Sequence, residues 1–367
     1  MKRFLLISPK NRTVYNFRGD LIKEIQAKGY DVWVTGPNRI DVGKVEALNV
    51  HFVEIPMKKN GINPLTDLKY VFLLWKLIRE ICPDVTLGYT IKPVIYGAIA
   101  ARLCGVPSIN SMVTGAGYIF SAKTMKARVL RIIGGILYKI GFACAHHVIF
   151  QNSDDLEEFT SARFVKRNKC HVVNGSGVNM DYFVPRPLPK QLTFFMLSRA
   201  LISKGVREYL QAARIVKQKY PDVRFMYLGA IESMPDTLTF NEVQSYIDDK
   251  TIDYFGETDD IRTYMEQCSV FVLPSYREGT PRTVLEAMSM GRAIITTATA
   301  GCRETVKNEI NGFLVPVQNV DALAERMEWF INHPNSVETM GLASFDYCSE
   351  KFDVRRVNYQ MMEICQV

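Results

Sequence analysis

Two glutamates eight positions apart, Glu278 and Glu286, flank a short segment with the composition of a ligand-binding turn. Glycine, threonine and proline follow Glu278, and Glu286 lies in the first turns of an expected helix. An apolar run at residues 270–273, typical of a buried strand, comes just before them. Strand, turn and helix in this order point backbone N–H groups and a helix N-terminus at an anion. Carboxylates beside such a turn repel phosphate but accept hydrogen bonds from sugar hydroxyls. The segment therefore predicts a nucleotide-sugar site.

Two basic residues, Arg199 and Lys204, follow another apolar run at residues 193–197 and precede an expected helix at residues 207–220. Helix starts favour acidic residues, so basic side chains at this place indicate an anion nearby. Arg can donate two parallel hydrogen bonds to phosphate oxygens, and Lys supplies a compact charge. Together they would stabilise the negative charge that develops on a leaving diphosphate. The alternative is a pair of solvated surface residues.

Four segments in order resemble the signature of the retaining GT-B glycosyltransferases of family 4. They are residues 174–185, which resemble an interdomain link, the basic segment 197–205, the glutamate segment 277–287, and the helix-to-strand return 301–312. Within the family the chain is similar to bacterial enzymes that extend undecaprenyl-diphosphate-linked sugars, such as the N-acetylgalactosaminyltransferase acting on lipid-linked bacillosamine. Residues 16–19, 90–93, 114–118 and 277–282 carry this closer likeness.

The resemblance implies a role for each matching residue. Arg199 and Lys204 would be catalytic on the donor diphosphate, and Glu278 would be catalytic by holding hydroxyls of the transferred sugar. Glu286 would bind the ribose diol. The other implied donor contacts are Gly279, Thr280, Pro281, Arg282 and Gly19. Phosphates of the acceptor or of the donor, which the sequence leaves open, would be received by Arg18, Lys92, Thr114 and Gly115.

No general base, metal site or cofactor motif stands out. Many family members carry a histidine where this chain has Thr114, but in a retaining transferase the leaving phosphate oxygen can take the acceptor proton. The sequence has no D-x-D motif, no P-loop and no G-x-G-x-x-G after its first expected strand. The resemblance implies a metal-independent transferase with no cofactor, which uses a UDP-sugar of N-acetylhexosamine or hexose as co-substrate.

Apolar strands alternate with amphipathic segments along the whole chain, which predicts parallel sheets of Rossmann type. Expected strands cover residues 4–8, 32–35, 84–87, 108–113, 193–197, 224–228, 252–255, 270–273 and 293–296. Expected helices cover residues 19–28, 66–81, 94–103, 207–220, 241–250, 259–267, 283–290 and 354–364. In the 66–81 segment, Leu68, Phe72, Trp75 and Leu77 recur near helical spacing.

The fold class expected is α/β of the GT-B type, with two Rossmann-like domains whose parallel sheets face each other across a cleft. Residues 1–184 would form an acceptor-binding domain with a membrane-facing basic region, and residues 190–345 the nucleotide-sugar-binding domain. Residues 346–367 would hold a C-terminal helix that crosses back to the first domain, as in the family. The Pro-rich stretch 185–189 marks the expected boundary.

The net charge of +7 on 367 residues has an uneven source, because residues 85–153 contain no acidic residue. Isoleucines recur at helical spacing over residues 122–142, with basic residues beside them. This pattern fits a helix in an anionic membrane interface and equally a core-facing helix with a solvated basic face. No run is long enough to span a bilayer. The expected location is the cytoplasm, peripherally at the inner face of the cell membrane, near a lipid-linked saccharide acceptor.

Two other functions fit parts of the sequence. A non-hydrolysing nucleotide-sugar epimerase shares the double-Rossmann architecture, but it needs acid and base groups for proton transfer at carbon. A nucleic-acid-binding protein would fit the basic first half, but no helix-turn-helix, zinc or RNA-binding motif is present, and no nucleic-acid partner is expected. Eight scattered cysteines without a C-x-x-C pair indicate reduced thiols.

Overall fold

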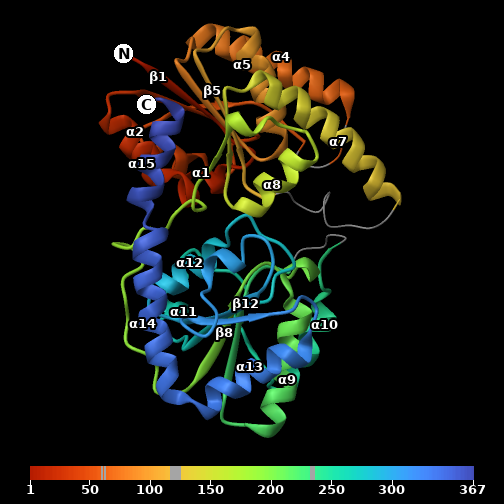
Figure 1. Ribbon diagram of the computed structural model, residues 1–367, viewed down its shortest axis with the longest axis vertical. Helices are drawn as coiled ribbons and strands as arrows, with labels where there is room; N and C mark the ends of the chain where they lie inside the picture. The colour runs from red at the N-terminus through yellow and green to blue at the C-terminus, as the bar shows by residue number, and fades with distance from the viewer. Residues whose placement is uncertain (59–60, 62, 116–124, 232–235) are drawn as a thin grey trace. The chain divides into compact units, whose positions relative to one another are not determined.

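The computed structural model describes residues 1–58, 61, 63–115, 125–231 and 236–367, with the side chains of residues 125–130 left out (Figure 1). The chain divides into two compact units: Met1–Ser176 together with Val354–Val367, and Gly177–Asp353. These bounds differ from the expected ones, because residues 177–184 and 346–353 lie in the second unit. The Pro-rich stretch 185–189 therefore lies inside this unit and not between the two.

The first unit is built on a seven-stranded parallel sheet with the order β3-β2-β1-β4-β5-β6-β7. The strands are β1 (Arg3–Ile7), β2 (Asp31–Gly36), β3 (His51–Glu54), β4 (Val85–Tyr89), β5 (Ser108–Val113), β6 (His147–Phe150) and β7 (Cys170–Val172). Side chains of β1 alternate between the two faces, so that Leu5 and Ile7 enter one hydrophobic cluster and Phe4 and Leu6 the other. The strand order reverses between β1 and β4, which is where open α/β sheets bind ligands.

Helices cover both faces of this sheet. They are α1 (Asn11–Phe17), α2 (Gly19–Ala27), α3 (Val42–Glu46), α4 (Pro64–Ile81), α5 (Ala98–Leu103), α7 (Met125–Cys144) and α8 (Ser153–Ser161). A π-helical turn, η1 (Pro93–Gly97), leads into α5. The hydrophobic cluster containing Leu74, Ala101 and Phe142 fills the face under α4, α5 and α7.

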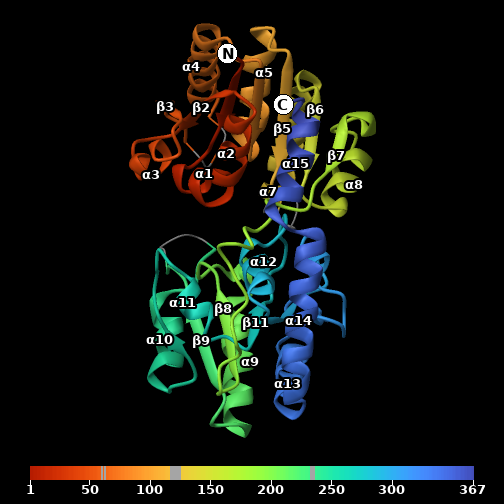
Figure 2. The ribbon, with the colours of Figure 1, turned by 90° about the vertical axis from the view of Figure 1, so that its left-hand side faces the viewer.

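The last helix, α15 (Val354–Cys365), packs on the first unit beside α2 and β5 (Figure 2). Val357 and Met361 enter the hydrophobic cluster on this face. The Ser108 hydroxyl donates to the carbonyl of Cys365 at 2.9 Å, and the Asn358 amide donates to Glu24 Oε1 at 2.8 Å. The chain therefore crosses between the units twice, at residues 176–177 and 353–354.

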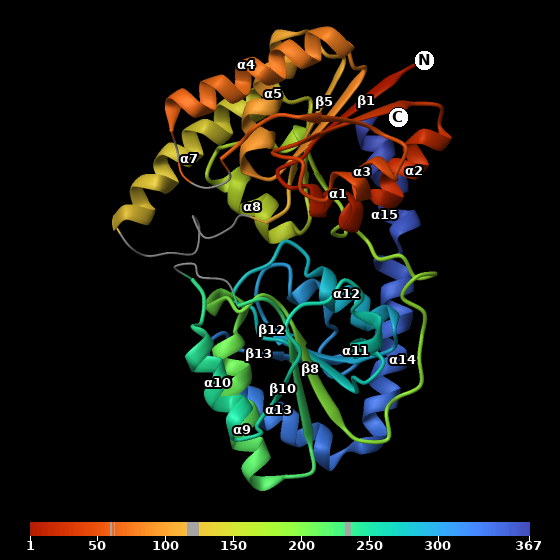
Figure 3. The ribbon, with the colours of Figure 1, turned by 180° about the vertical axis from the view of Figure 1, so that it is seen from behind.

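The second unit has a six-stranded parallel sheet with the order β10-β9-β8-β11-β12-β13 (Figure 3). Its strands are β8 (Thr193–Leu197), β9 (Arg224–Leu228), β10 (Asp253–Tyr254), β11 (Val270–Leu273), β12 (Ala293–Thr297) and β13 (Gly312–Val315). Its helices are α9 (Val206–Lys219), α10 (Phe240–Asp248), α11 (Arg262–Met265), α12 (Arg282–Ser289), α13 (Val320–Asn332) and α14 (Pro334–Lys351). Helices α9 and α13 pack together, as do α12 and α14.

The expected α/β class with two parallel, Rossmann-like units is confirmed, and the strands at residues 108–113, 193–197, 224–228 and 270–273 have the predicted bounds. The helix predicted over residues 259–267 was wrong in extent, since only Arg262–Met265 is helical. Ahead of it, Asp260 accepts two hydrogen bonds from the Arg262 guanidinium at 2.9 and 2.7 Å and one from its backbone N–H. This local alternative to helix formation explains the shorter element.

Two histidines on neighbouring strands of the first unit, His147 and His171, lie against each other. His147 Nδ1 lies 3.0 Å from His171 Nε2, and burial lowers the pKa of both imidazoles. The pKa of His147 is lowered further by His171, His146 and Lys169, and that of His146 is lowered by burial, Arg102 and Lys169. A native state that takes up protons less readily than the unfolded chain gains stability as pH rises.

We expect the free energy of unfolding of the first unit to be highest above the ordinary histidine pKa and to fall as the pH drops from about 7 to about 5. His171→Gln should flatten this slope, because one of the two facing imidazoles no longer takes up a proton. Urea unfolding at several pH values measures it, with His333→Gln in the second unit as control. Equal slopes in wild type and His171→Gln would contradict the assignment.

Candidate functional site

Four loops converge at the carboxyl edge of the second sheet, after β8, β9, β11 and β12. Glycines allow them to cross: a Cβ on Gly229 would meet the Ser198 carbonyl well inside contact distance, and one on Gly205 would meet the Pro274 carbonyl. Hydrogen bonds then tie the loops together. The backbone N–H of Tyr276 donates to the Ser203 carbonyl at 2.9 Å, and that of Glu278 donates to the Ala300 carbonyl at 3.2 Å. The predicted donor residues of this unit stand on this braced edge.

Lys204 and Glu278, predicted to be catalytic, form an ion pair between the Lys204 ammonium and Glu278 Oε1. Lys204 ends a short 3-10 helix, η3 (Ile202–Lys204), and Glu278 lies in the loop after β11. The two side chains are 27% and 12% exposed, so the pair is partly buried but still accessible. A cation that binds phosphate and a carboxylate that binds hydroxyls are thus placed side by side.

Glu286 lies on α12 and is buried, with Arg282 one turn earlier on the same helix. Arg282 Nε donates to Glu286 Oε1 at 3.1 Å, and Arg282 Nη1 donates to the carbonyl of Gly177 at 2.6 Å. Burial raises the pKa of Glu286, and the Arg282 guanidinium opposes this rise. Arg282, predicted to contact the donor, therefore reaches the carboxylate expected to bind the ribose and the backbone at the start of the unit.

The remaining predicted donor residues lie on the same edge. Arg199 is exposed in the loop after β8, where the next residue, Ala200, donates its N–H to the Ala230 carbonyl at 2.8 Å. Thr280 Oγ1 donates to the Gly279 carbonyl at 3.0 Å, and Pro281 has the extended backbone of an N-cap for α12. The structure thus brings the eight predicted residues of this unit to neighbouring loops and one helix start: Arg199, Lys204, Glu278, Gly279, Thr280, Pro281, Arg282 and Glu286.

Sequence reasoning missed a brace beneath Glu278. The Tyr276 hydroxyl donates to Glu208 Oε1 at 2.6 Å, and burial together with Glu208 raises the pKa of Tyr276 to about 12. Glu208 is an acidic residue in the first turn of α9, which starts two residues after Lys204. The only signal in the sequence was Glu208 itself. It did not point to Tyr276, because acidic residues are common in the first turn of a helix whether or not a partner lies opposite. The contact ties the loop of Glu278 to the helix behind Lys204.

In the first unit, Arg18 is buried where α1 meets α2. Its guanidinium lies over the Tyr89 ring at 5.3 Å, and Nη2 lies 3.1 Å from Met112 Sδ. The Tyr89 hydroxyl in turn bonds Ser8 Oγ at 2.7 Å and Thr13 Oγ1 at 2.8 Å. This polar cluster stands at the carboxyl ends of β1, β4 and β5, the position expected for a ligand site of this sheet.

The other predicted residues of the first unit are placed differently. Gly19 begins α2 and packs toward Leu48. Thr114 and Gly115 follow β5, while residues 116–118 of their loop, and residues 122–124 of the amphipathic segment, lie outside the described residues. Lys92 is buried, with Nζ 2.6 Å from Asp67 Oδ1, and the Tyr96 hydroxyl donates to Asp67 Oδ2 at 3.0 Å. The charge of Lys92 is therefore balanced within the unit, where it holds η1 against α4.

No three His, Cys, Asp or Glu side chains in the described ranges are grouped so that they could hold a metal ion. All eight cysteines have free thiols, and four of them are buried: Cys268, Cys302, Cys348 and Cys365.

Known proteins similar to this chain give the same assignment over both units. A family model for glycosyl transferases group 1 matches residues 182–344, and one for glycosyl transferase 4-like proteins matches residues 3–152. The N,N'-diacetylbacillosaminyl-diphospho-undecaprenol alpha-1,3-N-acetylgalactosaminyltransferase of Campylobacter jejuni is 28% identical, over 89% of this chain and 88% of that protein. The UDP-Gal:alpha-D-GlcNAc-diphosphoundecaprenol alpha-1,3-galactosyltransferase of Escherichia coli is 28% identical, over 73% and 71%.

Solved structures agree on the fold. A glycosyltransferase from Rickettsia africae has a TM-score of 0.80 at 20% identity and covers 100% of this chain and 98% of its own. The Anabaena protein HepE in complex with UDP has a TM-score of 0.80 at 18% identity and covers 99% of each chain. The expected GT-B fold class is thereby confirmed. With both halves matched in the expected order, this chain belongs to the group 1 glycosyltransferases, the family 4-like class that its motifs indicate.

Proposed function

We propose that this chain transfers a sugar, with retention of configuration and without a metal ion, from a UDP-sugar to a polyprenyl-diphosphate-linked saccharide in the assembly of a bacterial surface glycan. The observation that carries the proposal is the pair formed by Lys204 and Glu278 on the braced edge of the second sheet. The relatives from Campylobacter jejuni and Escherichia coli support the acceptor class, since both are named for undecaprenyl-diphosphate-linked acceptors.

The pair suggests how the donor is received. A donor diphosphate would replace Glu278 as the partner of Lys204, and the released carboxylate would accept hydrogen bonds from hydroxyls of the sugar. Arg199 would add a second cation on the diphosphate, so that charge on the leaving group is stabilised as it develops. Glu286 would accept hydrogen bonds from the ribose diol.

The transfer step breaks the bond between the anomeric carbon and the diphosphate oxygen and forms one between that carbon and the acceptor hydroxyl oxygen. The acceptor proton moves to the leaving diphosphate, which needs no enzymic base. An epimerase would instead need acid and base groups at a sugar carbon. The family match and the grouped cation and carboxylates favour transfer.

The first experiment is a thermal-shift and hydrolysis screen of UDP, GDP and their sugars, with a chelator present. We expect UDP to raise the melting temperature and one UDP-sugar to release UDP slowly. The anomeric configuration of the product formed on a synthetic polyprenyl-diphosphate saccharide then tests retention. No response to any nucleotide would overturn the proposal, and a requirement for added divalent metal would overturn its metal independence.

A row of exposed apolar side chains in the first unit supports a lipid-linked acceptor. Helix α7 leaves Ile132, Ile133, Ile136 and Ile140 exposed, with Ile132 60% and Ile136 56% accessible. The buried side of this helix carries Tyr138 and Phe142, and glycines let it approach its neighbours closely, because a Cβ on Gly135 would collide with the Phe164 ring and one on Gly141 with the Ile95 backbone. The isoleucines are therefore not core residues here. Of the two interpretations of the sequence pattern, we propose the interfacial one.

A second exposed apolar row lies on α4, where Leu65, Leu68 and Phe72 point to solvent. Both α4 and α7 pack against α5, on the same face of the first sheet (Figure 1). None of the helices in the described part of the chain is both long and apolar enough to cross a bilayer. We propose that these rows rest on an anionic membrane surface without spanning it.

We expect Ile136→Asp to lower the fraction of protein that floats with vesicles of phosphatidylglycerol and phosphatidylethanolamine several-fold, because a carboxylate replaces an exposed apolar side chain and repels anionic lipid. Ile310→Asp is the matched control, since Ile310 is 57% exposed in the second unit. If both variants float like the wild type, α7 is not the membrane-facing surface.

A further inference from the structure

We infer that Arg282 is a positioning residue that couples occupancy of Glu286 to the chain junction at Gly177. The inference rests on the proposed function, since the nucleoside diphosphate of the donor is the ligand that Glu286 would bind. In this role Arg282 touches neither the sugar nor the diphosphate. It acts through Glu286 and the Gly177 carbonyl, to which its guanidinium donates.

The guanidinium joins two groups that are far apart in the sequence. Nε donates to Glu286 Oε1 at 3.1 Å, and Nη1 donates to the Gly177 carbonyl at 2.6 Å. The side chain of Arg282 is only 12% exposed, so water does not easily replace either partner. Because the guanidinium is planar and rigid, a shift of one partner changes the geometry available to the other.

Gly177 is the first residue of the second unit, and the chain arrives there from Ser176 of the first. Gly175 and Gly177 have φ of 68° and 64°, a left-handed conformation that favours glycine on both sides of Ser176. The second crossing lies beside the first, because Val178 pairs with Asp353 and its N–H donates to the Phe352 carbonyl at 2.8 Å. Arg282 therefore holds the backbone at the first connection, next to Val178, whose N–H donates to the carbonyl of the residue before Asp353.

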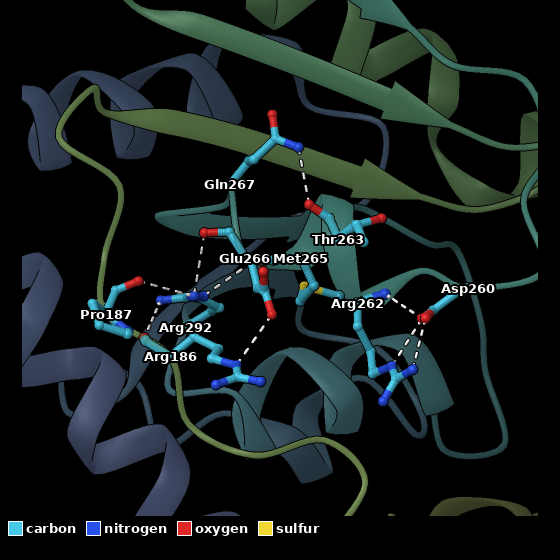
Figure 4. A network of polar contacts seen from close by, with 9 residues as sticks. All are labelled: Arg186, Pro187, Asp260, Arg262, Thr263, Met265, Glu266, Gln267 and Arg292. Atoms are coloured by element: carbon cyan, nitrogen blue, oxygen red, sulfur yellow. Dashed lines mark hydrogen bonds and ion pairs between the residues drawn. The ribbon is translucent and has the colours of Figure 1, made fainter.

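Beyond Gly177 the chain is fixed to the second unit by other contacts. The Ser289 hydroxyl donates to the Phe183 carbonyl at 2.6 Å. The fully buried Arg292 donates to the carbonyls of Arg186 and Pro187 at 2.9 and 3.3 Å, and Arg186 Nε lies 3.1 Å from Glu266 Oε1 (Figure 4). Residues 183–187 are therefore held by the second unit, and the bond from Arg282 holds the chain earlier, at Gly177.

Donor binding would change the charge that the Arg282 guanidinium balances. In the empty site the buried carboxylate of Glu286 has Arg282 as its cation, and burial raises the pKa of Glu286. Ribose hydroxyls that donate to Glu286 share its charge with Arg282, which alters the bond to Gly177. Helix α12 thus reports donor occupancy to residues 175–178.

Arg282→Lys separates the two contacts, because one ammonium can keep the charge beside Glu286 but cannot reproduce the rigid fork. We expect the dissociation constant for UDP to stay within about 3-fold of wild type while turnover at saturating donor falls about 10-fold or more. Arg282→Met should weaken both. Arg326→Lys, on α13, is the control for the Arg-to-Lys change itself, and melting temperatures show whether each variant folds.

Hydrogen exchange supplies a direct readout. In the wild type, UDP should slow amide exchange in residues 175–180, and in Arg282→Lys this slowing should disappear although UDP still binds. Unchanged turnover in Arg282→Lys, or UDP-induced slowing equal to that in the wild type, would overturn the coupling. Absence of any UDP binding to the wild type would instead remove the proposed function and this inference with it.

Discussion

Lys204→Met is expected to lower transfer from the UDP-sugar about 100- to 1000-fold while the protein stays folded. Lys204 forms an ion pair with Glu278. In the proposed reaction its charge binds the donor diphosphate and stabilises the leaving group. Without it, the carboxylate of Glu278, which is 12% exposed, faces the donor diphosphate uncompensated. The loss should therefore appear in kcat and in donor affinity. Rates of UDP release with saturating acceptor, and the dissociation constant for UDP, measure the two effects.

Lys307→Met is a suitable control, because Lys307 is a half-exposed lysine of the same unit whose Nζ lies 3.8 Å from Glu350. Its removal should leave transfer within about 2-fold of wild type, as exposed ion pairs contribute little. A second comparison uses Glu278→Gln alone and together with Lys204→Met. If the pair acts as one unit, the double variant loses much less than the product of the two single losses. Full activity of Lys204→Met would refute the assignment of the pair.

In the second unit, the sequence alone predicted most of the strands and the residues of the candidate site. Short apolar runs such as residues 193–197 and 270–273 predicted strands correctly, because buried parallel strands need continuous apolar residues. The order of motifs placed Lys204 and Glu278 in one site, although 74 positions separate them. The two residues meet because loops cross each other at glycines. A local sequence pattern does not reveal such a crossing.

The first unit shows what periodicity alone could not decide. The helix at residues 66–81 was correctly predicted, but two of the apolar residues that supported it, Leu68 and Phe72, are exposed, while Leu74 and Ile78 are buried. Both sides of this helix are apolar, so spacing could not choose the buried face. The isoleucines of α7 pose the same problem, and there Tyr138 and Phe142, together with glycines, take the buried side.

Charge partners were equally hidden. Lys92 was predicted to receive phosphate, yet Asp67 from another helix lies 2.6 Å from its ammonium. Arg282 was predicted to contact the donor, and the structure adds two partners inside the protein, Glu286 and the backbone of Gly177, 105 positions earlier. A sequence reveals that a charge exists, but its partner depends on contacts between distant segments. Buried charges are therefore the residues whose roles most need a structure.

Gly301→Ala is expected to abolish transfer and to lower the free energy of unfolding by about 2–4 kcal/mol. Gly301 has φ of 74°, in the left-handed region that disfavours a side chain. A Cβ at this position would also fall well inside contact distance of the carbonyls of Glu278 and Gly279. Both are backbone atoms, so the loop must move as a whole and take Glu278 away from Lys204.

Gly105→Ala is the control that separates backbone strain at a positive φ from a steric clash of the added Cβ. Gly105 has φ of 71°, close to that of Gly301, but an added Cβ there would meet nothing within 4 Å. This variant should lose only about 1 kcal/mol and keep its activity. Urea unfolding and transfer assays on the two variants measure the difference. If Gly301→Ala were as active as Gly105→Ala, the Glu278 loop would be free to shift without consequence, and the geometry of the ion pair could not be what sets the rate.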